Sequence, residues 1–80
     1  MAHNTAGGNT IDDHAEEQMN DRHITDWQVD QAIANGWTRP GNVVGRTEHH
    51  NEYGRGMCLM VVTAADGTVV TTYRHRARRH

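Results

Sequence analysis

The stretch MCLMVVTAADGTVVTTYRH, residues 57–75, decides the fold. Two runs rich in valine, threonine and other strand-forming residues flank an Asp-Gly pair, which accepts the positive φ angles of a tight hairpin turn. The pattern predicts antiparallel strands over residues 57–64 and 68–75, joined by a two-residue turn at Asp66-Gly67. The first run is apolar on both of its faces, so we expect it at the centre of the sheet.

The predicted turn also sets the register of the hairpin. Counting outward from the turn, the expected pairs are Val62 with Thr71, Met60 with Tyr73 and Cys58 with His75 on one face, and Val61 with Thr72 and Leu59 with Arg74 on the other. The chain has one cysteine, which therefore forms no internal disulfide. Within an apolar run, Cys58 is expected to be a small buried thiol rather than a nucleophile.

Two short helices are predicted before the sheet. Apolar residues spaced four apart, with acids gathered near the beginning, predict a helix over residues 12–22. Thr25 and Gln28 have the spacing of a capping box, which marks the beginning of a second helix. The Asn35-Gly36 pair supplies a left-handed stop, so this helix is expected over residues 26–35.

The segment between the helices and the hairpin has weaker signals. Residues 39–42 form a turn cluster, residues 43–48 read as an edge strand, and the polar residues 49–56 read as a loop. The expected fold is therefore α+β, with two N-terminal helices packed on a three- to four-stranded antiparallel sheet. The expected organisation is a flexible N-terminal segment over 1–10, one α+β domain over 11–76 and a basic tail over 77–80.

Charge is distributed unevenly along the 80 residues. Residues 1–35 carry seven acids and only Arg22, whereas residues 36–80 carry seven arginines and three acids. Arginine offers a fixed fork of donors that suits phosphate, so an anion-binding edge near the C-terminus is one interpretation, and a solvated tail is the other. No apolar run approaches the roughly 20 residues that span a bilayer, and the first ten residues lack the pattern of a secretory signal.

Residues 14–36, HAEEQMNDRHITDWQVDQAIANG, resemble the opening of a group of small domains of unknown function, H-A-x-x-x-M-x-x-R-x-I-[ST]-x-x-x-V-x-x-A-I. In that group a hairpin follows with the pattern G-x-x-L-x-V-V and ends T-x-Y, here residues 56–62 and 71–73. The resemblance covers about residues 13–75. These domains are similar to the RelE-like and colicin-like (BECR) superfamily of RNase toxins, found at the C-terminal ends of bacterial polymorphic and contact-dependent inhibition toxins.

The resemblance implies a metal-independent endoribonuclease that cleaves RNA, such as tRNA, by attack of the 2′-OH. It implies no cofactor and no bound metal, a cognate immunity or antitoxin protein, and neither DNA nor a membrane as partner. It places the site of action in the bacterial cytoplasm, with secretion as part of a larger toxin. The expected catalytic residues are His14, Arg22, Thr71 and Tyr73. The expected substrate-binding residues are Arg46, Arg74, His75 and Arg76.

The chemical requirements of RNA cleavage point to a similar set of catalytic residues. Metal-free RNA cleavage needs a base, an acid, and a cation for the phosphorane, and histidine and arginine suit these roles. His14 and Arg22 lie about 80° apart around one helix, while Thr71, Tyr73 and His75 alternate onto one strand face. If the first helix packs across that face, all five surround one cleft. The alternative is that His14 is a surface residue and Tyr73 belongs to the core.

Two other interpretations of the sequence stay open, a metal site and a protein-binding patch. Residues 48–50 with Glu52 and His75 could supply nitrogen and oxygen ligands to a divalent metal, although their spacing matches no established zinc pattern. Trp27 and Trp37 flank the second helix and, with Tyr53, form either an exposed patch for a protein partner or part of the core. The alternative function is a non-enzymatic protein-binding or regulatory module, of the kind associated with phages or toxin-antitoxin pairs.

Overall fold

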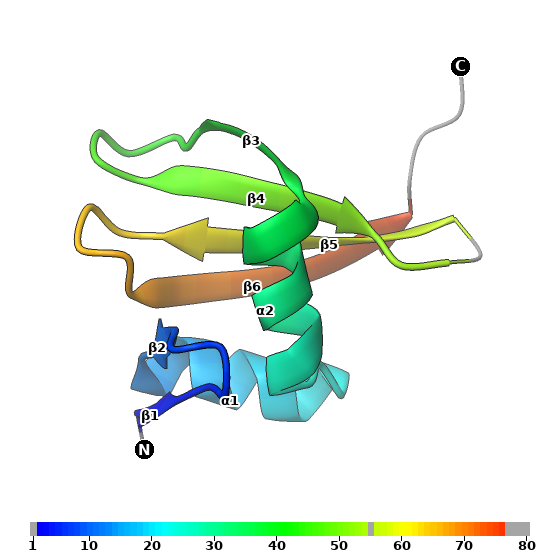
Figure 1. The fold of residues 1–80 in the computed structure, drawn as a ribbon, viewed down its shortest axis with the longest axis horizontal. Coiled ribbons are helices and arrows are strands. Elements are labelled where there is room, and N and C mark those ends of the chain that lie inside the picture. The colour runs from blue at the N-terminus through cyan, green and yellow to red at the C-terminus, as the bar shows by residue number, and fades with distance from the viewer. Residues whose placement is uncertain (1, 55, 77–80) are drawn as a thin grey trace.

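The computed structural model describes residues 2–54 and 56–76, which form two helices and one sheet (Figure 1). The helices are α1 (Asp13–Arg22) and α2 (Asp26–Asn35). The strands are β1 (His3–Asn4), β2 (Thr10–Ile11), β3 (Trp37–Pro40), β4 (Thr47–Glu52), β5 (Met57–Thr63) and β6 (Val69–Arg76). In Figure 1, α2 crosses the front of the sheet and α1 runs beside β6.

The sheet has six strands in the order β1-β2-β6-β5-β4-β3. Neighbouring strands are antiparallel except β2 and β6, which are parallel. The expectation of a three- to four-stranded antiparallel sheet is therefore wrong, because a parallel β2 and a short β1 extend one side and β3 extends the other.

The β5–β6 hairpin has the register predicted from the sequence, including Cys58 opposite His75 and Met60 opposite Tyr73. β5 is central, as expected. The turn is longer than predicted, because the Ala64 amide donates to the Thr68 carbonyl at 2.9 Å and Gly67 adopts a φ of 88°. A register shift at the end of β5 takes up the one-residue difference, so the outer pairs keep the predicted alignment.

Both helices lie close to their predicted residues, and α1 begins one residue later than expected. The Asp12 carboxylate accepts a 2.8 Å hydrogen bond from the Ala15 amide before α1, and the predicted capping box at Thr25 begins α2. The end of α2 differs from the expectation, since Gly36 is extended with a φ of −72°. A Cβ at Gly36 would lie 2.5 Å from the His50 carbonyl oxygen, so glycine serves here to let β4 approach α2 closely.

The middle segment departs furthest from the prediction. Instead of a strand over 43–48 and a loop over 49–56, the chain forms β3, a turn, and β4, whose last four residues fall in the predicted loop. β4 has the sequence TEHHNE and no aliphatic side chain, yet Glu48 and His50 are only 6% and 5% exposed. Their burial depends on contacts from other strands, which an alternation of apolar residues could not reveal.

The N-terminal segment, expected to be a flexible lead-in, contains β1 and the first residue of β2. The Asp30 carboxylate of α2 accepts hydrogen bonds from Thr5 Oγ1 at 2.5 Å, the Gly7 amide at 2.9 Å and Asn9 Nδ2 at 2.8 Å. Burial alone would raise the pKa of Asp30, but these hydrogen bonds lower it below its usual value. The segment is thereby fastened to α2. The basic tail expected over 77–80 lies outside the described residues.

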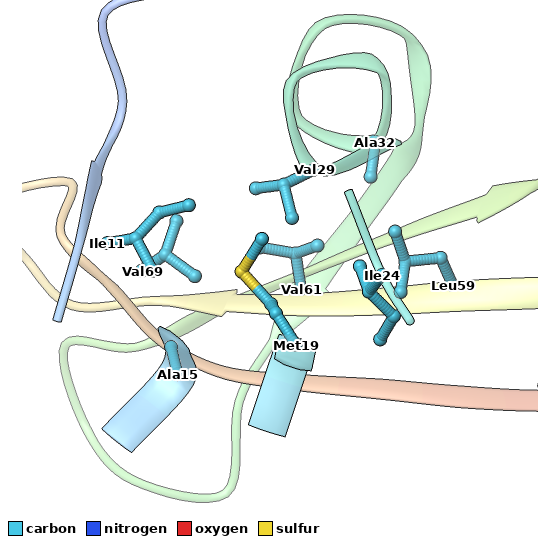
Figure 2. Close-up of a cluster of buried hydrophobic side chains, with 9 residues drawn as sticks. All are labelled: Ile11, Ala15, Met19, Ile24, Val29, Ala32, Leu59, Val61 and Val69. Atoms are coloured by element: carbon cyan, nitrogen blue, oxygen red, sulfur yellow. The ribbon is translucent and has the colours of Figure 1, made fainter. Parts of the chain in front are cut away.

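The hydrophobic core lies on one face of the sheet, between β5, β6 and the two helices (Figure 2). Figure 2 shows Val29 of α2 and Met19 of α1 pointing toward Val61 of β5. The complete cluster is Ile11, Ala15, Met19, Ile24, Val29, Ala32, Leu59, Val61 and Val69. Because successive strand residues point to opposite faces, the neighbours of Val61 face away from the helices.

Among the described residues, neither helix combines the length and apolar character needed to cross a membrane. Each helix has ten residues, about 15 Å at 1.5 Å per residue, against a hydrocarbon core of about 30 Å.

Candidate functional site

The face of the sheet opposite the helices, called here the open face, gathers the chemically active side chains. Strand alternation and register place the following residues on it: Trp37 and Arg39 of β3, Glu48, His50 and Glu52 of β4, Cys58, Met60 and Val62 of β5, and Thr71, Tyr73 and His75 of β6. This face is polar and aromatic at most positions. The opposite face, by contrast, supplies Leu59 and Val61 to the core.

A continuous row of rings and one guanidinium crosses the open face. Trp37 stacks on His50 with ring centroids 4.1 Å apart and planes 7° apart. The His50 ring meets His75 edge-on at 6.2 Å, and His75 stacks on Tyr73 at 5.9 Å. The row ends at Arg22, whose Cζ lies 5.9 Å from the Tyr73 ring centroid. Contacts of this kind between cation and aromatic face are favourable and hold the guanidinium in place.

Arg22 reaches this row from α1 because, among the residues that the structure describes, no strand covers the edge of β6 beyond Val69. In that part of the chain, β2 pairs with β6 at a single position, Ile11 with Val69. Further along, side chains of α1 replace a strand partner: Gln18 Oε1 accepts from the Thr72 amide at 3.0 Å, and Arg22 Nη1 donates to the Thr72 carbonyl at 3.4 Å. The last turn of α1 thus holds a cation beside Tyr73, which is 48% exposed.

The structure brings together some of the residues expected in an active site. Arg22 contacts Tyr73. Thr71 lies two residues before Tyr73 on β6 and faces the same side of the sheet. His14 is an exposed residue of the first turn of α1, eight residues before Arg22 and therefore about 12 Å away along the helix axis. Among residues 2–54 and 56–76, no hydrogen bond, ion pair or ring contact joins His14 to the other three. α1 lies beside β6 rather than across the face that carries Tyr73.

The expected substrate-binding residues do not converge either. His75 lies on the open face, whereas Arg74 is opposite Leu59 and Arg76 opposite Met57, which places both arginines on the other face. Arg46 is exposed in the turn between β3 and β4. Of these four residues, only His75 joins the row of rings.

A hydrogen-bonded triplet, in which Glu48 and His50 are buried and Arg39 is exposed, supports one side of the open face. Glu48 Oε1 accepts from Arg39 Nε at 2.7 Å and from His50 Nε2 at 2.9 Å. Hydrogen bonds from His50 and Arg39 lower the pKa of Glu48, so its carboxylate is ionised and acts only as an acceptor. This triplet was not predicted from the sequence, because the pairing of β3 with β4 that forms it was not predicted.

Cys58 lies between the two histidines of the row. It is buried, as predicted, and burial raises the pKa of its thiol. Ligand atoms of His50, Cys58 and His75 all lie within 4.8 Å of one another. The metal site considered from the sequence included both of these histidines but not the cysteine. The predicted pairing of Cys58 with His75 could have indicated that Cys58 belongs to the same group of ligands.

Both tryptophans are exposed rather than part of the core, with Trp27 at 67% and Trp37 at 58%. Tyr53 is partly buried and packs against the core. On the helix side, a pocket of about 240 Å³ separates α2 from the ends of β4 and β5. Its lining residues are Trp27, Gln28, Gln31, Asn51, Glu52, Tyr53 and Leu59. The pocket lies apart from the row of rings.

The open face therefore combines an anchored cation, an exposed phenol, two imidazoles and an exposed indole within one strip. Such groups can bind a phosphate, stack on a planar base and transfer protons near neutral pH. Comparison of the chain with protein-family models, with curated proteins and with solved structures returns no match.

Proposed function

We propose that this chain binds single-stranded RNA across its open face and cleaves it without a metal ion. The observation that carries the proposal is the contact chain from Arg22 through Tyr73 to His75, because it joins a phosphate-binding cation to two groups that can transfer protons. The resemblance of residues 14–36 and 71–73 to RNase toxin domains supports the same chemistry.

The hydrogen bond made by His75 supports its role in the proposed cleavage. Nδ1 of His75 donates to the Arg76 carbonyl, which leaves Nε2 with a free lone pair. In this proposal, Nε2 takes the proton of the 2′-OH, whose oxygen attacks the phosphorus. The Tyr73 hydroxyl gives its proton to the departing 5′-oxygen, and Arg22 stabilises the charge of the phosphorane. The products are a 2′,3′-cyclic phosphate and a 5′-hydroxyl.

Base stacking supports the choice of RNA as substrate. Single-stranded RNA is bound largely through aromatic side chains on which unstacked bases lie, each worth about 1–3 kcal/mol. Tyr73 and Trp37 are both exposed on the open face and lie at opposite ends of the row of rings. A strand of RNA crossing from β6 to β3 would meet one at each end.

The test is cleavage of a labelled single-stranded RNA in a chelating buffer by the wild type and by three variants. His75→Gln and Tyr73→Phe should each lower the rate by roughly two to four orders of magnitude. Arg22→Ala should lower it by about 10²–10³, the usual effect of removing a group that stabilises transition-state charge. A His23→Asn variant is the control, because His23 is exposed and asparagine tolerates its positive φ.

His14→Ala distinguishes the two assignments of the base. If His14 is the base, as the resemblance implies, its replacement should remove activity while His75→Gln retains it. If His75 is the base, the pattern is reversed. Cleavage that requires a divalent ion, or that survives all of these substitutions, contradicts the proposal.

One observation favours the non-enzymatic alternative. The turn between β3 and β4 exposes Val43 and Val44 at 52% and 102%. Adjacent apolar side chains on a protruding turn are typical of a contact for a protein partner. A cognate immunity protein would be such a partner. Binding of a purified candidate that is lost in Val44→Ser, with no RNA cleavage by the wild type, would favour this function.

A further inference from the structure

We propose that Cys58, His50 and His75 form a binding site for a thiophilic transition-metal ion, with Zn²⁺ as the ion that the ligand set fits best. The site would hold the ion on the open face, through one ligand from each of β4, β5 and β6. It goes beyond RNA cleavage and does not rest on it, since metal binding is measured without RNA.

The register of the sheet creates the site. Cys58 and His75 are directly opposite each other in the β5–β6 pair, while His50 lies one step along on the other neighbour of β5. Their ligand atoms lie within 4.8 Å of one another. Tetrahedral zinc with Zn–N of about 2.0–2.1 Å and Zn–S of about 2.3 Å requires separations of about 3.3–3.6 Å. Binding of an ion would therefore draw these ligand atoms closer together, by rotation of the three side chains.

Each histidine has one nitrogen fixed by an acceptor, which leaves the other for a metal. A carboxylate oxygen of Glu48 accepts from Nε2 of His50 at 2.9 Å, so that nitrogen carries the hydrogen and Nδ1 keeps a lone pair. The Arg76 carbonyl accepts from Nδ1 of His75 at 3.0 Å, so Nε2 keeps the lone pair. A carboxylate or a carbonyl behind each ligating imidazole is the usual outer shell of a metal site.

The surroundings hold these ligands in place. Arg39 fixes the Glu48 carboxylate at 2.7 Å, and Trp37 stacks on the outer side of the His50 ring at 4.1 Å. His50 and Cys58 are only 5% and 6% exposed, and a buried, pre-oriented ligand pair loses little side-chain freedom when it binds an ion. Three protein ligands leave the fourth position of a tetrahedral ion for water.

One sulfur and two imidazoles select among ions. Magnesium and calcium prefer oxygen ligands, whereas thiolate with imidazole suits zinc and its spectroscopic substitute cobalt. The cysteine loses its proton on binding, so one proton is released for each ion bound.

If the proposed RNA cleavage also holds, a second consequence follows. An ion bound to Nε2 of His75 removes the lone pair assigned to the base, so zinc would inhibit cleavage and a chelator would restore it.

The test is titration of the full chain with Co²⁺ under reducing conditions, followed by visible and near-ultraviolet absorption. The expected result is an intense d–d spectrum typical of four-coordinate cobalt, a thiolate-to-cobalt charge-transfer band, and displacement of both by Zn²⁺. Cys58→Ser should abolish the charge-transfer band. Glu48→Gln should weaken binding by about 10–100-fold, as outer-shell substitutions do.

The matched control is His23→Asn, which removes an exposed histidine that is not one of the three ligands and should bind as the wild type does. If the variants fold poorly, zinc-dependent thermal stabilisation of the wild type gives a second reading, because a ligand that binds only the folded state raises Tm with its concentration. A weak six-coordinate cobalt spectrum without a thiolate band, or no rise in Tm with zinc, overturns the proposal. Neither result depends on whether RNA is cleaved.

Discussion

Replacing Asp30 by asparagine tests whether residues 1–10 belong to the folded domain. The carboxylate accepts three hydrogen bonds from the N-terminal segment, from Thr5, Gly7 and Asn9. Asparagine keeps one acceptor oxygen but turns an NH₂ group toward one of these donors. At least one hydrogen bond to a charged acceptor is then lost, and the others become neutral.

The expected magnitude follows from typical values. A hydrogen bond to a charged group contributes about 1.5–3 kcal/mol and a neutral one about 0.5–1.5 kcal/mol. Because part of this network is exposed to solvent, we expect Asp30→Asn to lower the free energy of unfolding by about 1–2 kcal/mol. For a domain of this size that corresponds to roughly 4–16 °C in Tm.

Calorimetry gives the stability, and amide hydrogen exchange at Gly8 and Asn9 reports the segment directly, since both amides are bonded within it. The pKa of Asp30 is lowered in the folded protein, so its contribution is complete above the unfolded value and is lost as pH falls through the folded value. Asp21→Asn is the control, since Asp21 is exposed on α1. Equal Tm values for Asp30→Asn and the wild type, with unchanged exchange, would refute the reasoning.

Three further predictions concern the core, the N-terminal histidine and RNA binding. Leu59→Ala should destabilise the domain by about 2–5 kcal/mol, measured by urea unfolding, because Leu59 is 1% exposed in the core. The pKa of His3 is raised, chiefly by its hydrogen bond with Asp26. Protection of β1 against proteolysis should therefore be full below about pH 6.5 and decline as pH rises through the pKa of His3 in the folded protein. The His3→Gln variant should not show this decline. Arg39→Gln should reduce the slope of log affinity for single-stranded RNA against log salt by about 0.7–1, whereas Arg74→Gln, on the other face, should leave it unchanged.

Local signals predicted the helices and the hairpin correctly. The capping box at Thr25 and the Asp12 cap act within a few residues, and the Asp-Gly turn with its β-branched flanks specifies a hairpin without distant contacts. The turn length was wrong because a bulge at the end of β5 offsets a longer loop, and the sequence contains no separate mark for it.

The remaining strands depend on distant contacts. All four residues of β3 are exposed, and the buried residues of β4 are charged or polar, so neither strand shows the alternation that predicts burial. Glu48 is buried because Arg39 and His50 satisfy it. β1 is held because Glu16 and Asp26 bind its His3, and Asp30 binds the residues that follow it. Such pairs become visible only when segments far apart in the sequence meet.

The candidate site was predicted in part. The Arg22 and Tyr73 contact agrees with the expectation that both line one site, and the strand alternation placed Thr71, Tyr73 and His75 on one face correctly. His14 is the exception, since α1 lies along the edge of β6 and its first turn is distant from its last. That arrangement follows from Gln18 and Arg22 bonding to Thr72, which spacing along the helix does not predict.

We expect RNA to lie on the open face, and a nuclear magnetic resonance titration tests this most directly. The ligand is a short single-stranded RNA with 2′-O-methyl groups, which cannot attack the phosphorus and so stays intact. We predict that the largest shifts occur at Trp37, Tyr73 and His75 and at the side chain of Arg22, with small shifts along α2. Shifts confined to the helix side of the sheet, or no saturable shifts at low salt, would contradict the account.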